Sequence, residues 1–257
     1  MEELRHGTAL ARSGVVAKQK RSTSKRERID TGKNKMRAKR IRASHEELPF
    51  ADAFTQDGLE APGYMYLLGL GDAATQVVID RIERALAGGA FQFVDGLLDD
   101  PNWRPHLVGA IALILDDGDH LDARSLWRAI DAGSWVNPQL VVTALMVDRE
   151  FPIRLVERVE SSCPISPAPG LSPIERHSAT GPGNTRLRSA KLLASLLSVG
   201  TALPSLSSWI AGVREEPRVI ELLQLDFDNA PSIAASWQTN LVEQFFVRGR
   251  LLKPKAA

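Results

Sequence analysis

The feature that most constrains the fold of this chain is the spacing of its apolar residues, which is helical almost everywhere over residues 61–248. Val78, Ile82 and Leu86 recur every four positions, as on one face of an α-helix, and a glycine pair follows them as a stop. No stretch shows the sustained two-residue alternation that a half-buried strand needs. The periodicity therefore predicts an all-α fold.

Turn residues divide this region into predicted helix pairs of roughly 25 to 35 residues, a length typical of helical repeats. Two joints are alike: DDPNWRP (99–105) and DAGSWVNPQ (131–139) each place an acid, a turn residue and a tryptophan before a helix that proline begins. This pattern resembles armadillo and HEAT-like repeats. The resemblance implies a solenoid of stacked helix pairs over residues 62–248; an irregular helical bundle is the alternative. The predicted pairs span 72–98, 101–133, 137–161, 184–214 and 217–248.

Composition changes divide the chain into four predicted parts. Residues 1–48 form a basic, largely disordered arm, residues 49–161 the N-terminal helical repeats, and residues 184–257 the C-terminal helical repeats. Residues 162–183 between them carry five prolines and three glycines. So long a segment without periodicity is either a linker or a binding or regulatory loop, and composition does not separate the two.

The charges are unevenly distributed, although the formal net charge is only +1. Residues 1–44 contain 14 lysines and arginines against 4 acidic residues, whereas the rest of the chain contains 18 basic and 27 acidic residues. The near-neutral total thus conceals a basic arm and an acidic body. Such asymmetry points to an interaction tail rather than to a feature of the fold.

The basic arm is the strongest functional indication in the sequence. Its apolar residues are too sparse to offset the entropy of ordering, so we expect disorder in isolation. Closely spaced cations neutralise phosphates, although no aromatic residue lies among them to stack on bases. Nucleic acid, an acidic protein surface, a solvated tail and a nuclear-import signal all fit these residues. The residues predicted to bind nucleic acid or an acidic partner are Lys18, Lys20, Arg21, Lys25, Arg26, Arg28, Lys33, Lys35, Arg37, Lys39, Arg40 and Arg42.

Three groups of residues are candidates for a catalytic or metal site. Asp116, Asp117, Asp119, His120 and Asp122 form the densest cluster of potential metal ligands, but they lack the glycine and glutamate positions of a calcium loop. Helix-end capping explains them more simply. Cys163 and His177 share the proline-rich segment without a recognisable nucleophile motif. The five histidines show no zinc-ligand spacing, so no metal and no cofactor are predicted.

Trp127 and Asp131 are spaced by one helical turn. This spacing is similar to that of HEAT-like alkylpurine DNA glycosylases, in which Trp and Asp residues hold and hydrolyse a damaged nucleotide. The resemblance implies a DNA-directed hydrolase as a third interpretation. Against it, the body is acidic, whereas a surface that grips duplex DNA should be basic. A buried Trp127 and a solvated Asp131 are the structural alternative.

The remaining sequence features bear on location and partners. A single cysteine, Cys163, rules out an intrachain disulfide, and no apolar run is long enough to span a membrane. The segment RERIDTGKNKMRAKR (26–40) resembles a basic stretch of small bacterial proteins without assigned function, which implies a bacterial cytoplasm. The sequence thus predicts a non-enzymatic scaffold that binds a protein partner and is anchored by its arm, with no membrane and no small-molecule substrate evident. A nucleic-acid-associated protein is the runner-up.

Overall fold

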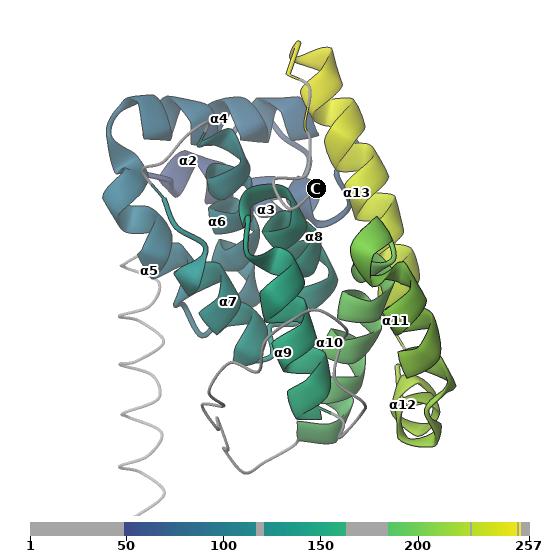
Figure 1. Ribbon diagram of the computed structural model, residues 1–257. Helices are drawn as coiled ribbons and strands as arrows, with labels where there is room; N and C mark the ends of the chain where they lie inside the picture. The colour runs from purple at the N-terminus through teal and green to yellow at the C-terminus, as the bar shows by residue number, and fades with distance from the viewer. Residues whose placement is uncertain (1–48, 117–120, 163–184, 227, 251, 253–257) are drawn as a thin grey trace, which may run out of the picture. The chain divides into compact units, whose positions relative to one another are not determined.

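A computed structural model describes residues 49–116, 121–162, 185–226, 228–250 and 252, with only the backbone described for residues 185–189. The described residues form 12 α-helices, a short 3-10 helix and no strand, so the all-α prediction is confirmed (Figure 1). The elements are α2 (Ala51–Phe54), α3 (Gly63–Gly69), α4 (Thr75–Ala87), η1 (Ala90–Phe93), α5 (Val94–Leu98), α6 (Trp103–Leu115), α7 (Arg124–Asp131), α8 (Asn137–Val147), α9 (Phe151–Ser162), α10 (Thr185–Gly200), α11 (Pro204–Glu215), α12 (Pro217–Leu223) and α13 (Ala230–Val247).

Helices α6 and α8 form the centre of the fold. Every residue of α6 from Pro105 to Leu115 is buried, as is every residue of α8 from Asn137 to Met146. A helix that is apolar all round must be covered on all sides, because no face of it favours water. Helices α3, α4, α5 and α7 pack on α6, while α7, α10 and α13 pack on α8.

The covering helices are amphipathic, as α4 illustrates. The predicted stripe of Val78, Ile82 and Leu86 is buried, whereas Asp80 on the opposite face is exposed. The helix ends where the glycine pair was predicted to stop it, and Gly89 has a φ of 87°. This left-handed conformation is readily adopted by glycine, so the chain turns there without strain.

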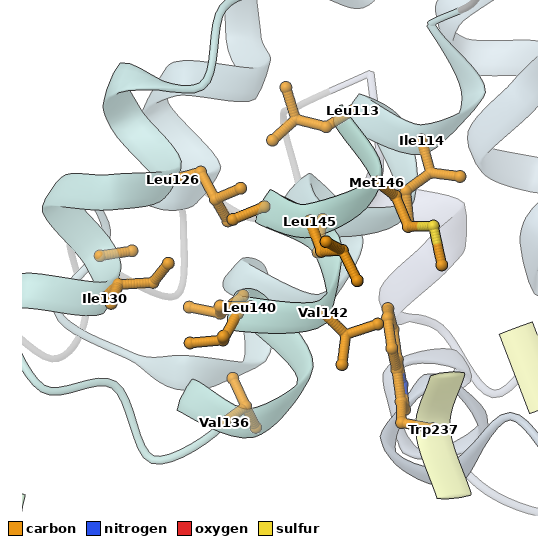
Figure 2. Packing of buried hydrophobic residues seen from close by; sticks show 14 of the residues in the cluster. Leu113, Ile114, Leu126, Ile130, Val136, Leu140, Val142, Leu145, Met146 and Trp237 are labelled. Carbon is orange, nitrogen blue, oxygen red and sulfur yellow. The ribbon is translucent and has the colours of Figure 1, made fainter. Parts of the chain in front are cut away.

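Figure 2 shows part of the hydrophobic core. Leu126 and Ile130 of α7 lie against Leu140 and Leu145 of α8, and Trp237 reaches the same core from α13. Fully burying one such aliphatic side chain contributes about 1.5–3 kcal/mol to folding. Helices from the beginning, middle and end of the described chain therefore share one cluster.

The last helix packs on one of the first. Three side chains of α13 donate hydrogen bonds to carbonyls at the end of α3, which have no partner within that helix. These bonds run from Trp237 Nε1 to Leu67 O at 3.0 Å, from Asn240 Nδ2 to Gly69 O at 2.8 Å and from Gln244 Nε2 to Leu70 O at 2.8 Å. In a repeat array each unit contacts only its neighbours. Because α13 and α3 meet across 170 positions of sequence, the predicted stacking of successive HEAT-like pairs is not confirmed.

The described residues all belong to one compact unit. Helices α8, α9 and α10 pack together, so the helices before and after the predicted 162–183 loop share a core. Residues 163–184 of that loop lie outside the described part of the chain, as does the basic arm. Among the described residues, no helix combines the length and the apolar character that crossing a membrane requires.

Candidate functional site

The two similar joints of the sequence meet in the structure. Trp103 begins α6 and Trp135 lies just before α8, and their ring centroids are 5.1 Å apart at an interplanar angle of 50°. Tyr64 of α3 meets Trp103 edge-on at 5.9 Å, and Phe54 of α2 lies 6.4 Å from Tyr64. We call Phe54, Tyr64, Trp103 and Trp135 the aromatic row. Because α7 returns the chain between α6 and α8, both helices begin at the same end of the core and present this row there.

The aromatic row opens to solvent at Trp135. That side chain is 53% exposed, whereas Phe54, Tyr64 and Trp103 are half-buried. Large exposed aromatic surface is unfavourable in water and is a common component of protein interfaces. The row therefore has a fixed, packed end and an accessible one.

Two cations lie against the rings. The Arg104 guanidinium carbon is 5.1 Å from the centroid of Trp103 and 5.5 Å from that of Tyr64. Lys191 Nζ of α10 is 5.2 Å from the centroid of Trp135 and 2.9 Å from Asp228 Oδ2. Electrostatic attraction between a cation and a ring holds such contacts together.

A buried histidine links the joints beneath the row. His106 Nε2 lies 2.7 Å from the Asp100 carbonyl oxygen, and Nδ1 lies 2.8 Å from Ser134 Oγ. Burial lowers the pKa of His106, although the Asp100 carbonyl and the charges of Asp100 and Asp99 oppose this shift. In the neutral ring, Nε2–H donates to the carbonyl and Nδ1 accepts from the Ser134 hydroxyl. The histidine thus fixes one joint relative to the other.

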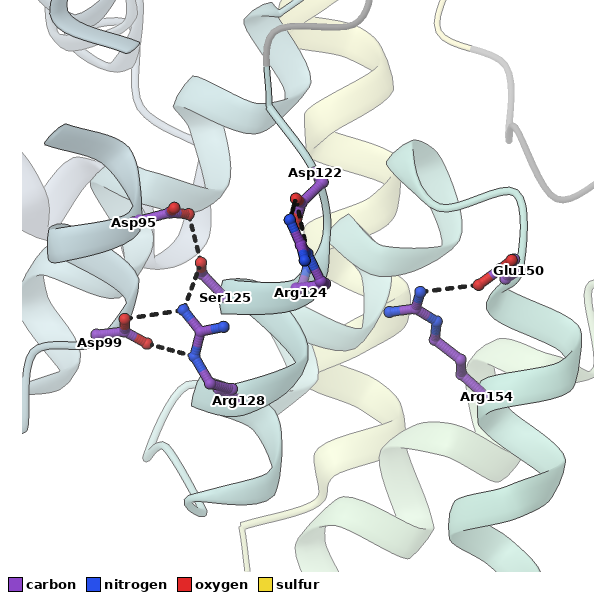
Figure 3. A network of polar contacts seen from close by, with 8 residues as sticks. All are labelled: Asp95, Asp99, Asp122, Arg124, Ser125, Arg128, Glu150 and Arg154. Atoms are coloured by element: carbon purple, nitrogen blue, oxygen red, sulfur yellow. Dashed lines mark hydrogen bonds and ion pairs between the residues drawn. The ribbon is translucent and has the colours of Figure 1, made fainter. Parts of the chain in front are cut away.

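A surface network attaches the first joint to α7. Figure 3 shows Arg128 donating to both carboxylate oxygens of Asp99, at 2.9 Å each, and to Ser125 Oγ at 2.8 Å. Ser125 in turn donates to Asp95 of α5. Arg128 and Asp99 are about half-exposed, so the pair contributes little stability. The pair affects the site because Arg128 engages both oxygens of the Asp99 carboxylate.

Trp127 is buried in the core and does not face solvent. Its ring is 2% exposed, and its indole N–H donates to Asp148 Oδ2 at 2.6 Å. The Arg158 guanidinium carbon lies 4.1 Å from the ring centroid, and Arg158 donates to both oxygens of Asp131 at 2.7 Å each. Trp127 and Asp131 are therefore both engaged within the protein. Their arrangement does not offer a ring face to a nucleotide.

The other predicted candidates are resolved only in part. Asp116 Oδ2 accepts from the Leu121 amide at 2.8 Å, and Asp122 pairs with Arg124 at 2.6 Å. Among the described residues no three His, Cys, Asp or Glu side chains gather as a metal site would require. Asp117, Asp119, His120, Cys163 and His177 lie outside the described part, as do all of the predicted binding residues of the arm.

Sequence reasoning did not identify the residues that make up the aromatic row. The likeness of the two joints was the available signal, since each carries a tryptophan shortly before a proline. Tyr64 and Lys191 come from distant helices and have no local pattern to mark them. Comparison of the chain with models of known protein families, with curated proteins and with solved structures finds no match in any of the three.

Proposed function

We propose that this chain is a non-enzymatic binding protein, a helical scaffold that holds a protein partner at the aromatic row. The single observation that carries the proposal is Trp135, 53% exposed at the end of an otherwise packed row of rings. Tryptophan, tyrosine and arginine dominate the energetically important positions of protein interfaces. Trp135, Tyr64 and Arg104 gather these three residue types at one end of the core.

The support beneath the row fits this function. Trp103 packs against Tyr64 and Trp135, while His106 links the two joints through Asp100 and Ser134. A binding surface whose side chains are already ordered loses less conformational entropy when a partner binds. In this proposal the basic arm adds non-specific electrostatic attraction, which raises the rate of encounter with acidic surfaces.

The experiment that tests this proposal is affinity purification of the full chain from its native cells. We expect defined proteins to be recovered with the unchanged chain and lost with Trp135→Ala. The matched control is Phe246→Ala on α13, which removes another exposed aromatic ring, 71% exposed, away from the row. Recovery of the same proteins with Trp135→Ala would refute the proposal.

The composition of the arm favours a second candidate function, association with nucleic acid. Fourteen basic residues within residues 1–44 suit sequence-tolerant phosphate binding. We expect full-length protein to bind duplex DNA with an affinity that falls steeply between about 50 and 200 mM salt. Replacing Lys33, Lys35, Arg37, Lys39 and Arg40 by serine should weaken that binding and reduce its salt dependence. Unchanged DNA affinity in this variant would exclude residues 33–40 as the binding segment.

A further inference from the structure

The proposed function does not specify what kind of segment the aromatic row binds. The charge and the contacts of Arg104 indicate the charge of that segment. Asp99 is paired with Arg128, and Lys191 is paired with Asp228. Arg104 donates to Asn102 Oδ1 at 3.3 Å and lies over two rings, but among the described residues it has no carboxylate partner. It is an exposed positive charge held in a fixed place.

The ring contacts determine which ligand charge can bind. An aromatic ring attracts a cation, and Trp103, Tyr64 and Trp135 already have cations of this chain beside them. A cationic ligand would therefore meet like charge at the row. A guanidinium carries five N–H donors in a fork geometry that suits an oxyanion, and the bond from Arg104 to Asn102 uses one of them. The ligand group that Arg104 can bind is therefore an anion.

The surroundings favour a carboxylate on a protein over the phosphates of a nucleic acid. Asp99 and Asp100 lie in the same joint as Arg104, and Asp228 lies beside Lys191. A polyphosphate chain would bring several negative charges close to these groups, whereas a peptide can present a single carboxylate to Arg104.

The geometry also limits the spacing of the ligand groups. The Trp103 ring centroid lies 5.1 Å from the Arg104 guanidinium carbon and 5.1 Å from the Trp135 ring centroid. The Arg104 guanidinium carbon and the Trp135 ring centroid are therefore at most about 10 Å apart. An extended peptide advances about 3.3–3.6 Å per residue. A carboxylate on Arg104 and an apolar side chain on Trp135 would therefore be separated by about three residues or fewer.

From these observations we propose that the aromatic row binds an extended peptide segment of a partner protein in which an aspartate or glutamate lies within about three residues of an aromatic or aliphatic side chain. The carboxylate accepts from Arg104, and the apolar side chain packs on Trp135. This proposal rests on the proposed function and specifies its partner. It uses no residue outside the described part of the chain.

The test is selection from a random dodecapeptide display library on immobilised full-length protein, followed by affinity measurement with the selected peptides. We expect enrichment of peptides with the stated acidic and apolar spacing. Arg104→Gln and Trp135→Ala should each weaken their binding by about tenfold or more. Arg84→Gln, an exposed arginine of α4, and Phe246→Ala are the matched controls and should leave the affinity unchanged.

A charge exchange separates a direct contact from a structural effect. Arg104→Glu should lose the selected peptide and should bind its counterpart in which lysine replaces the acidic residue. A change in folding alone would not produce this reversal. Failure of the exchange, or selected peptides without an acidic residue, would overturn the carboxylate proposal.

The remaining outcomes distinguish this proposal from the function on which it rests. Selected peptides that depend on Trp135 but not on Arg104 would refute the carboxylate and retain the binding function. If no peptide is enriched, the proposal of a peptide ligand fails, while the affinity purification still decides the function. A labelled oligothymidylate whose binding falls with both Arg104→Gln and Trp135→Ala would assign the row to nucleic acid and overturn the proposal.

Discussion

Two contacts between an arginine and a tryptophan in the described part of the chain, Arg158 on Trp127 and Arg104 on Trp103, differ in what surrounds them. At Trp127 the ring is buried, its N–H donates to Asp148, and Arg158 is held by both oxygens of Asp131. At Trp103 the ring lies in a row that reaches solvent, and Arg104 has no carboxylate partner among the described residues. The first contact is complete within the protein. The second leaves a charge and an exposed ring for another molecule.

The comparison shows that an arginine on an aromatic ring does not by itself indicate a binding site. The neighbouring carboxylates decide its role, because they either neutralise the guanidinium or leave it available. On this basis we propose a stabilising role for the contact at Trp127 and a binding role for the aromatic row.

The largest expected effect is on the buried tryptophan. Trp127→Ala should lower the free energy of unfolding by about 3–5 kcal/mol, because it leaves a cavity and removes the partner of Asp148. Trp135→Ala should lower it by about 1 kcal/mol or less, since that side chain is about half exposed and its loss opens no buried cavity. Urea unfolding followed by circular dichroism measures both. Equal losses would contradict the division between a structural and a binding tryptophan.

A smaller loss is expected from the carboxylate that completes the first contact. Asp148 is buried, and its Oδ2 accepts from Trp127 Nε1 at 2.6 Å and lies 3.4 Å from Arg154 Nε. Asp148→Ala leaves the indole N–H without its acceptor, which should cost about 1–3 kcal/mol of unfolding free energy. The matched control is Asp228→Ala, which removes an exposed acid beside Lys191. An effect at Asp228 as large as that at Asp148 would show that burial does not decide the outcome.

The same contrast explains what the sequence could and could not predict. The apolar spacing in α4, α6 and α8 is a local pattern, so the helices and the buried face of α4 followed from it, whereas the burial of α6 and α8 on every side did not. The packing of α13 on α3 joins residues that are distant in the chain, and no local pattern specifies it. The sequence marked Trp127 by its spacing from Asp131 and Trp135 by its place in the second joint. Only the fold brings Asp148 to the Trp127 indole and Asp131 to Arg158, which shows that this ring is closed.

The two arginines should differ in stability less than the two tryptophans do. Arg158→Gln removes an ion pair and a ring contact and should lower the free energy of unfolding by about 1 kcal/mol, since its partner Asp131 is half-exposed. Arg104→Gln should lower it by about 0.5 kcal/mol or less, because that side chain is exposed and no carboxylate of the described residues pairs with it. Chemical denaturation of the two variants beside the unchanged chain measures the difference. A larger loss at Arg104 would assign that arginine to stability.

The smallest expected effect is a pH dependence that originates beneath the aromatic row. Burial lowers the pKa of His106 in the folded state, whereas in the unfolded chain it lies near the ordinary value of about 6.5. Between the folded-state and the unfolded-state pKa of His106, the unfolded chain binds a proton that the folded chain does not. The free energy of unfolding therefore falls as the pH drops below about 6.5.

This effect is limited because the Asp100 carbonyl and the charges of Asp100 and Asp99 favour the protonated ring. Protonated Nδ1 can no longer accept from Ser134, so the hydroxyl has to turn and accept from the ring instead, while the contact at Trp127 is unaffected. Urea unfolding at pH 7.5 and pH 5.5 should therefore show a smaller decline in His106→Asn than in the unchanged chain. An identical decline in both would place the pH dependence elsewhere and leave the aromatic row without a titrating support.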